Sequence, residues 1–208
     1  ELVVSLDADF LGTWISPVEF AAGYASGRSL ESQPPSLSYH AQFESRMSVT
    51  GSKADLRRAV PPSEIGLVAN QVAQRLARSA GSNVRWESAA ETSVPAKELD
   101  DLAARLWESR GRSLVVCGVQ DVSTQIVCNY LNHLLGNYGN TVDIEHPSFQ
   151  RQGNDQALDA LLQDLRDRKV AVLIVDGVDP VSELPDGEQL AGWLKSVPLK
   201  VSFQDHLD

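Results

Sequence analysis

Short apolar runs alternate with amphipathic segments along the chain, and this alternation limits the fold most strongly. The apolar runs, such as 2–6 and 114–117, have the length of buried strands, while 96–109 places Leu99, Leu102 and Leu106 at helical spacing. Strands that alternate with helices indicate βαβ units and a parallel sheet. We therefore predict an α/β fold.

The alternation predicts two Rossmann-like, three-layer α/β blocks with mainly parallel sheets. The first block is expected at 1–80 and the second at 111–208, with a connector and one helix at 81–110 between them. The second strand is expected at 38–43, followed by a long polar loop over 44–55. The other strands are predicted at 2–6, 114–117, 170–175 and 199–203, and the helices at 17–27, 63–76, 96–109, 123–135, 155–168 and 187–196.

Two details of this pattern are specific enough to test. Ser63 stands where an N-cap would begin the helix that follows it. The run 170–175 is continuously apolar, which is typical of a parallel strand covered on both faces. The chain also opens inside an apolar run and closes just after another, so we expect it to be a piece of a longer protein.

Composition narrows the classes of function. The formal net charge of −10 argues against non-specific binding to nucleic acid, which needs a basic surface. No apolar run approaches the roughly 20 residues that span a bilayer, so we expect a soluble fragment without direct membrane insertion. Cys117 and Cys128 have no CxxC spacing, which favours two buried small apolar residues over a metal site and leaves a disulfide as the alternative.

Carboxylates gather in the loops that follow two of the strands. Asp7 and Asp9 follow the first strand, and Asp176 and Asp179 follow 170–175. Ligands of parallel sheets bind at the carboxyl ends of strands, so these pairs could serve a metal or a ribose. The alternative is that they cap the turns after them, and the absence of a nearby His or Cys partner favours capping. No nucleophile–base pair, GxGxxG motif or P-loop is visible, so we predict no catalytic and no metal-ligating residue.

Two further features could contact a nucleotide. Glu44 ends the second strand, where an acid can accept hydrogen bonds from ribose hydroxyls. The stretch 136–140 reads G-N-Y-G-N and could offer backbone amides to a phosphate. Each also has a structural explanation: an ordinary strand end in the first case, and a helix stop with a turn in the second.

The order of several short motifs resembles a known family. Residues 44–55 read E-S-R-M-S-V-T-G-S-K-A-D and resemble the E-P-R-M-S-x-T-G-A-N-A-D segment of molybdopterin oxidoreductases. Residues 9–19 resemble the strand-end loop and helix of the polysulfide, thiosulfate and tetrathionate reductase branch. Matches in the same order follow at 135–139 (L-G-N-Y-G), 177–180 (G-V-D-P), 184–186 (L-P-D), 201–203 (V-S-F) and 207–208 (L-D).

This resemblance implies a set of positions around a pyranopterin guanine dinucleotide. In the family, the matching loops line that cofactor. The positions that it places near one guanosine part are Glu44, Arg46, Ser48, Thr50 and Asp55, with Asp9 in the neighbouring strand-end loop. Gly136, Gly139 and Asp179 would lie near the other half of the cofactor.

The sequence departs from the family pattern at positions that matter for an anionic cofactor. Residues 62–64 read P-S-E and lack the family's glycine, and 140–142 read N-T-V where the family has a double glycine. Asp9 and Asp179 stand where the family has asparagines, and an ionised Asp cannot donate a hydrogen bond to a phosphate. Two like unit charges about 4 Å apart at an effective dielectric near 20 repel by about 4 kcal/mol.

The form S-L-D-A-D-F-L-G at 5–12 is most similar to the molybdopterin-oxidoreductase-like iron–sulfur subunit of alternative complex III. That resemblance implies a respiratory electron-transfer assembly that oxidises quinol at the periplasmic face of the cytoplasmic membrane. This domain would bind no cofactor, the iron–sulfur clusters would lie elsewhere in the parent, and the partners would be other subunits and the parent's ferredoxin-like region. The alternative is half of the molybdopterin guanine dinucleotide cradle of a true molybdenum reductase, and a weaker one is a nucleotide-binding module.

Overall fold

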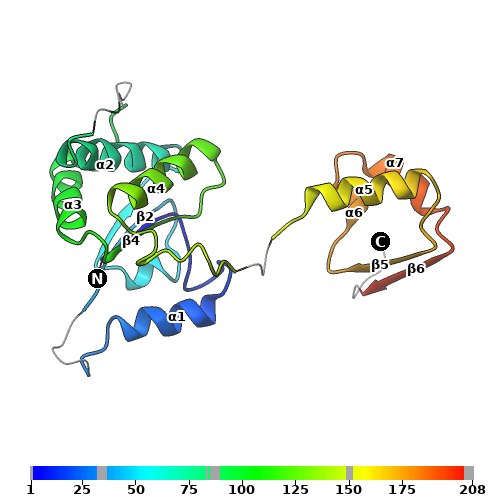
Figure 1. Ribbon diagram of the computed structural model, residues 1–208, viewed down its shortest axis with the longest axis horizontal. Coiled ribbons are helices and arrows are strands. Elements are labelled where there is room, and N and C mark those ends of the chain that lie inside the picture. Colours follow the sequence, from blue (N-terminus) through cyan, green and yellow to red (C-terminus); the bar gives the residue numbers. More distant parts are fainter. Residues whose placement is uncertain (1, 32–36, 83, 85–89, 149–151, 204–208) are drawn as a thin grey trace. The chain divides into compact units, whose positions relative to one another are not determined.

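The computed structural model describes residues 2–31, 37–82, 84, 90–148 and 152–203 (Figure 1). The chain divides into two compact units, Glu1–Gln150 and Arg151–Asp208, and each is built on its own parallel sheet. The predicted α/β class with mainly parallel sheets is therefore confirmed. The proposed match at 207–208 lies outside the described residues.

The first unit is organised around a four-stranded parallel sheet. Leu2, Val4 and Leu6 of its central strand are almost fully buried, as expected for a strand with a neighbour on each side. The strand order is β3-β2-β1-β4, so successive strands spread outward from β1 in both directions. The strands are β1 (Leu2–Leu6), β2 (Tyr39–Glu44), β3 (Leu56–Ala59) and β4 (Ser113–Cys117).

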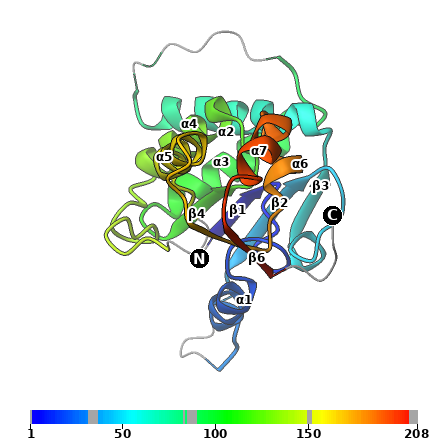
Figure 2. The same ribbon diagram turned by 90° about the vertical axis from the view of Figure 1, so that its right-hand side faces the viewer.

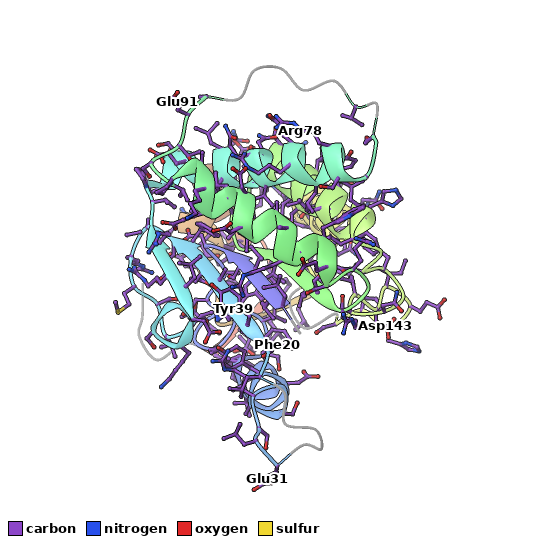
Figure 3. The ribbon with its side chains drawn as sticks, turned by 90° about the vertical axis from the view of Figure 1, so that its left-hand side faces the viewer. Phe20, Glu31, Tyr39, Arg78, Glu91 and Asp143 are labelled. Carbon is purple, nitrogen blue, oxygen red and sulfur yellow. The ribbon has the colours of Figure 1, made fainter. Side chains whose placement is uncertain are left out.

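Among the described residues, three amphipathic helices cover one face of this sheet and a single helix lies on the other (Figures 1 and 3). The covering helices are α2 (Ile65–Ser79), α3 (Ala96–Glu108) and α4 (Val122–Leu134), with α2 packed against the other two. The buried leucines Leu99, Leu102 and Leu106 of α3 follow the predicted spacing. The buried apolar side chains of α2 and α4 complete the main core. Helix α1 (Pro17–Ser26) has no buried residue, so it packs against the opposite face of the sheet less closely than the other three helices pack against theirs.

The second unit contains a two-stranded parallel sheet with helices on one side (Figures 1 and 2). A small core around Leu165, Leu190 and Val197 joins helices to strands. Its elements are α5 (Asp155–Arg166), β5 (Val172–Asp176), α6 (Pro180–Glu183), α7 (Gly187–Leu194) and β6 (Leu199–Phe203).

The structure corrects the predicted block boundary. Strand β4 pairs with β1, and α4 packs on α2, so residues 111–150 belong to the first unit. The division falls near 150 instead of near 110. The reason is physical: a local pattern predicts a strand, but not the strand with which it pairs.

Two smaller predictions are also wrong. Ser63 does not cap α2, because a short 3-10 turn, η2 (Pro62–Glu64), precedes the helix and Glu64 occupies the N-cap position. Strand β5 is not covered on both faces within its unit: Val172 is 52% exposed and Ile174 is 62% exposed.

The prediction of two buried cysteines is confirmed, since Cys117 and Cys128 are buried free thiols. Within the described part of the chain, no helix has both the length and the apolar character needed to cross a membrane.

Replacement of Phe43 by alanine tests the main core. Phe43 lies on β2 and is 1% exposed, so truncation leaves a cavity and should lower the free energy of unfolding by about 3–5 kcal/mol. Urea denaturation followed by circular dichroism measures the change. Val18→Ala is the matched control, because Val18 is 84% exposed and its loss should change stability by less than about 0.5 kcal/mol. Equal effects of the two substitutions would contradict this core assignment.

Candidate functional site

The carboxyl ends of β1, β2 and β4 meet at a polar pocket of about 460 Å³. This is the edge at which parallel sheets bind ligands. The pocket brings together several of the predicted positions. Its lining includes Asp7, Asp9, Glu44, Arg46, Ser48 and Gly118.

Asp9 points its carboxylate at the loop that follows β2. Its Oδ1 accepts hydrogen bonds from the backbone N of Thr50 (3.1 Å) and from Thr50 Oγ1 (2.8 Å). Its Oδ2 accepts one from Thr13 Oγ1 (3.2 Å). Burial acts to raise the pKa of Asp9, but these hydrogen bonds outweigh it and hold the pKa below its ordinary value. Asp9 is therefore an ionised acceptor whose donors come from its own chain.

Glu44 is the last residue of β2, and its side chain is almost completely buried. It accepts hydrogen bonds from Ser48 Oγ (2.6 Å), Arg57 Nε (2.5 Å) and Gln42 Nε2 (3.1 Å). The backbone N of Ser48 also donates to it. Burial acts to raise the pKa of Glu44, and the hydrogen bonds from Ser48 and Arg57 reverse that effect, so the pKa is lowered. The carboxylate ties β2, β3 and the following loop together.

Three glycines leave room for this arrangement. A Cβ on Gly12 would stand 2.3 Å from Asp9 Oδ2, and one on Gly51 would stand 1.9 Å from Glu44 Oε1. A Cβ on Gly118 would meet the carbonyl oxygen of Asp7 at 2.2 Å, where the loops after β1 and β4 cross. The motif spacing D-x-x-G at Asp9 and the glycine seven residues after Glu44 therefore have a steric cause.

The predicted site residues do not all come together. Asp9, Glu44, Arg46 and Ser48 line the polar pocket, and Thr50 is buried behind Asp9. Asp55 lies apart from it. Its carboxylate pairs with Arg28 (2.7 and 2.8 Å) and accepts from the backbone N of His40, near the amino end of β2, and the Arg28 hydrogen bonds lower its pKa.

The positions predicted for the second cofactor half also lie elsewhere. Gly136 and Gly139 adopt positive φ in a turn whose Asn137 contacts Ser113, the first residue of β4, so the turn is at the amino end of that strand. The amides of both glycines donate within the chain, to His133 and Val142. Asp179 lies in the second unit and accepts from the backbone N of Val181 and Ser182, which makes it the N-cap of α6. The capping interpretation is confirmed for Asp179.

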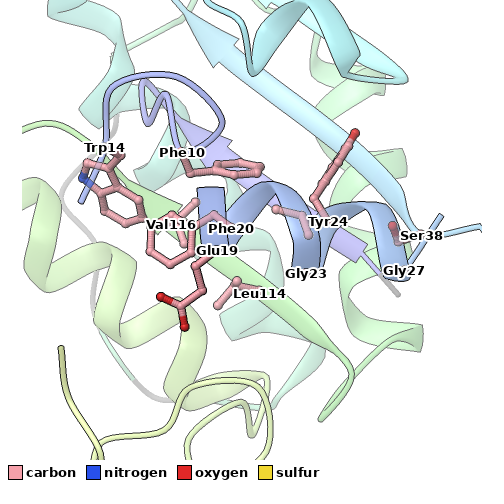
Figure 4. A pocket seen from close by; sticks show the side chains of 11 residues that line it. Phe10, Trp14, Glu19, Phe20, Gly23, Tyr24, Gly27, Ser38, Leu114 and Val116 are labelled. Atoms are coloured by element: carbon pink, nitrogen blue, oxygen red, sulfur yellow. The ribbon is translucent and has the colours of Figure 1, made fainter. Parts of the chain in front are cut away.

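Sequence reasoning missed a second feature, a row of buried polar side chains along β2. His40, Gln42 and Glu44 occupy alternate positions and point to the same face of the sheet. The spacing H-x-Q-x-E inside a strand was the signal that could have revealed the row. Beside it, between α1 and the sheet, lies an apolar groove of about 490 Å³ (Figure 4). Phe10, Trp14, Phe20, Tyr24, Leu114 and Val116 line this groove.

The site has no metal-binding cluster within the ranges that the structure describes, because no group of three or more His, Cys, Asp or Glu side chains is arranged to hold an ion. In comparisons with known proteins, the chain matches neither a protein-family model nor a curated protein sequence. The site must therefore be interpreted from its own geometry.

Gly51→Ala tests the link between the carboxylate and the loop. The added methyl group would overlap Glu44 Oε1, so the carboxylate must move and lose hydrogen bonds. We expect the free energy of unfolding to fall by about 1–3 kcal/mol. Gly23→Ala is the control, because that helical position has nothing within 4 Å of the new Cβ and the change should stabilise the protein by about 0.4–1 kcal/mol. Urea denaturation of both variants measures the difference, and destabilisation of both would contradict the steric explanation.

Proposed function

We propose that this chain is a cofactor-free structural domain of a molybdopterin-oxidoreductase-like subunit, within a respiratory complex that oxidises quinol. Two things support the proposal: the ordered motif resemblance, and the state of the polar pocket at the sheet edge. The observation that carries it is that the hydrogen-bond donors of the loop after β2 already donate to carboxylates of the same chain, those of Asp9 and Glu44. Its location would be the periplasmic face of the cytoplasmic membrane.

A pyrophosphate-bearing cofactor needs hydrogen-bond donors at this edge. The backbone amide and the hydroxyl group of Thr50 donate instead to Asp9. The backbone amide and the hydroxyl group of Ser48 donate to Glu44. Arg46 is exposed and lines the pocket, but it shares the pocket with three carboxylates, Asp7 included. A phosphate would have to displace an internal anion that is already well bonded. The pocket is therefore consistent with a domain that retains the loops of the family fold but no longer binds the cofactor.

A second observation supports a packing role. On the open face of the small sheet, four apolar side chains are at least half exposed, at 52% for Val172 and Leu199, 62% for Ile174 and 66% for Phe203. Parallel sheets are found almost only with both faces covered. We propose that a neighbouring part of the respiratory assembly covers this face.

The metal and pterin content of the full-length parent tests the proposed function. The parent, purified with its complex, should contain iron from its clusters but molybdenum and pterin far below one per molecule. Metal analysis by mass spectrometry and fluorescence of the oxidised pterin measure both. Stoichiometric molybdenum and pterin would overturn the proposal in favour of a cofactor cradle of a molybdenum reductase. The absence of iron as well would overturn the assignment to an electron-transfer subunit.

Substitution on the open face tests the packing role. Ile174→Asn in the full-length parent should leave the domain folded, because the side chain points to solvent, but should reduce the co-purification of neighbouring subunits at least several-fold. Val18→Asn, at an exposed position of α1, is the control and should retain them. Quantitative mass spectrometry of the purified complexes compares the two. Unchanged recovery with Ile174→Asn would exclude this face as the interface.

A further inference from the structure

Helix α1 is held to the sheet by few contacts. It has no buried residue, and its side-chain contact with the polar row is through Tyr24. The Tyr24 hydroxyl donates to the carbonyl oxygen of Lys53 (2.9 Å) and lies 3.3 Å from His40 Nδ1. Arg28, just after the helix, adds the ion pair with Asp55. His40 therefore lies directly beneath the attachment point of α1.

The hydrogen bonds of the row determine where the proton of His40 resides. Gln42 donates its amide Nε2 to Glu44, so its Oε1 must act as an acceptor toward His40 Nε2 (3.2 Å). The neutral His40 ring then carries its proton on Nε2 and presents a lone pair at Nδ1 toward Tyr24. A second proton can only be added at Nδ1, which faces α1.

In the part of the chain that the structure describes, a charged His40 would have no uncommitted counter-charge. The side chain is 0% exposed, and its ring packs against Phe10 (5.4 Å) and Tyr24 (5.6 Å between centroids). The charged groups that act on it are Asp55, Glu44 and Arg28. Asp55 is paired with Arg28 and Glu44 with Arg57, so both carboxylates are already neutralised.

Magnitudes decide how the protein would respond to the second proton. Protonated Nδ1 could donate to the Tyr24 oxygen, and a hydrogen bond from a charged group contributes about 1.5–3 kcal/mol. Burial of an uncompensated charge costs several kcal/mol. Consistent with this balance, burial is the largest influence on the pKa of His40 and lowers it below its ordinary value, against the opposing hydrogen bond with Gln42. Because α1 has no buried residue and contributes none to the main core, its release would bring water to the ring without uncovering that core.

We propose that uptake of a proton by His40 releases helix α1 from the sheet and opens the apolar groove beneath it. In the closed form Phe10 is buried, whereas Trp14, Phe20, Leu114 and Val116 are half-buried. All five groove residues then become more accessible under mildly acidic conditions (Figure 4). The direction follows from linkage. The closed form binds the proton more weakly than an open form with an ordinary histidine, so it loses stability as the pH falls from about 6.5 through the lowered pKa.

Hydrogen exchange of the α1 amides tests this switch. After correction for intrinsic rates, protection of residues 17–26 should fall at least severalfold between pH 7.5 and pH 5, because the open form takes up the proton more readily than the closed form. Protection of α2 should stay constant, because the opening is local. His40→Gln keeps a donor for Gln42 and cannot titrate, so its α1 protection should not depend on pH. His133→Gln, on the exposed side of α4, should respond like the wild type.

The outcomes separate the switch from acid unfolding. Constant α1 protection in the wild type, a wild-type response retained in His40→Gln, or equal loss of protection in α2 would each overturn the proposal. If His40→Gln does not fold, the ring nitrogens of His40 in the wild type are followed by NMR. Their titration midpoint should then coincide with the loss of α1 protection, and a His40 that protonates while α1 stays protected would also overturn it.

Discussion

The hydrogen-bonded carboxylate of Glu44 is the constraint on which the carboxyl edge of the main sheet depends. It is buried at the end of β2, and it accepts from the next loop through Ser48 and from β3 through Arg57. A buried carboxylate without these hydrogen-bond donors would lower the free energy of unfolding by several kcal/mol. Because it has them, the loop after β2 is drawn back against the sheet, where Thr50 can meet Asp9. The hydrogen bonds of Glu44 therefore fix the loop that forms one wall of the polar pocket.

The sequence predicted those parts of the fold that local patterns control. The apolar run 2–6 and the helical spacing of 96–109 and 155–168 are strong local signals, and their elements lie where expected, with both helices ending one or two residues early. Strand β3 was missed, because Leu56-Arg57-Arg58-Ala59 is short and half charged and forms a strand only by pairing with β2. The boundary near 150 was missed for a related reason. Pairing of β4 with β1 joins segments more than a hundred residues apart, and no local pattern carries that information.

The candidate site was predictable only where the parallel topology brings loops together. Asp9 follows β1 and Glu44 ends β2, its parallel neighbour, so their proximity follows from the fold class. Asp55 was grouped with them because it lies in the same motif, but η1 (Gly51–Lys53) leads the chain back toward the amino end of β2 before Asp55 is reached. Gly136 and Gly139 likewise lie at the amino end of β4. The order of motifs shows where a residue lies along the chain. Whether that residue reaches the site depends on whether its loop lies at the carboxyl end or the amino end of a strand.

The polar pocket and the polar row share Glu44, and this joins the two proposals physically. An acid that served an external ligand would keep part of its hydrogen-bonding capacity free. Glu44 instead directs its capacity inward, to Arg57 and the loop on one side and to Gln42 on the other. Its negative charge is therefore neutralised within the chain, as Asp55 is by Arg28. The same internal pairing that leaves little for a phosphate to bind also leaves a protonated His40 without an uncommitted counter-charge.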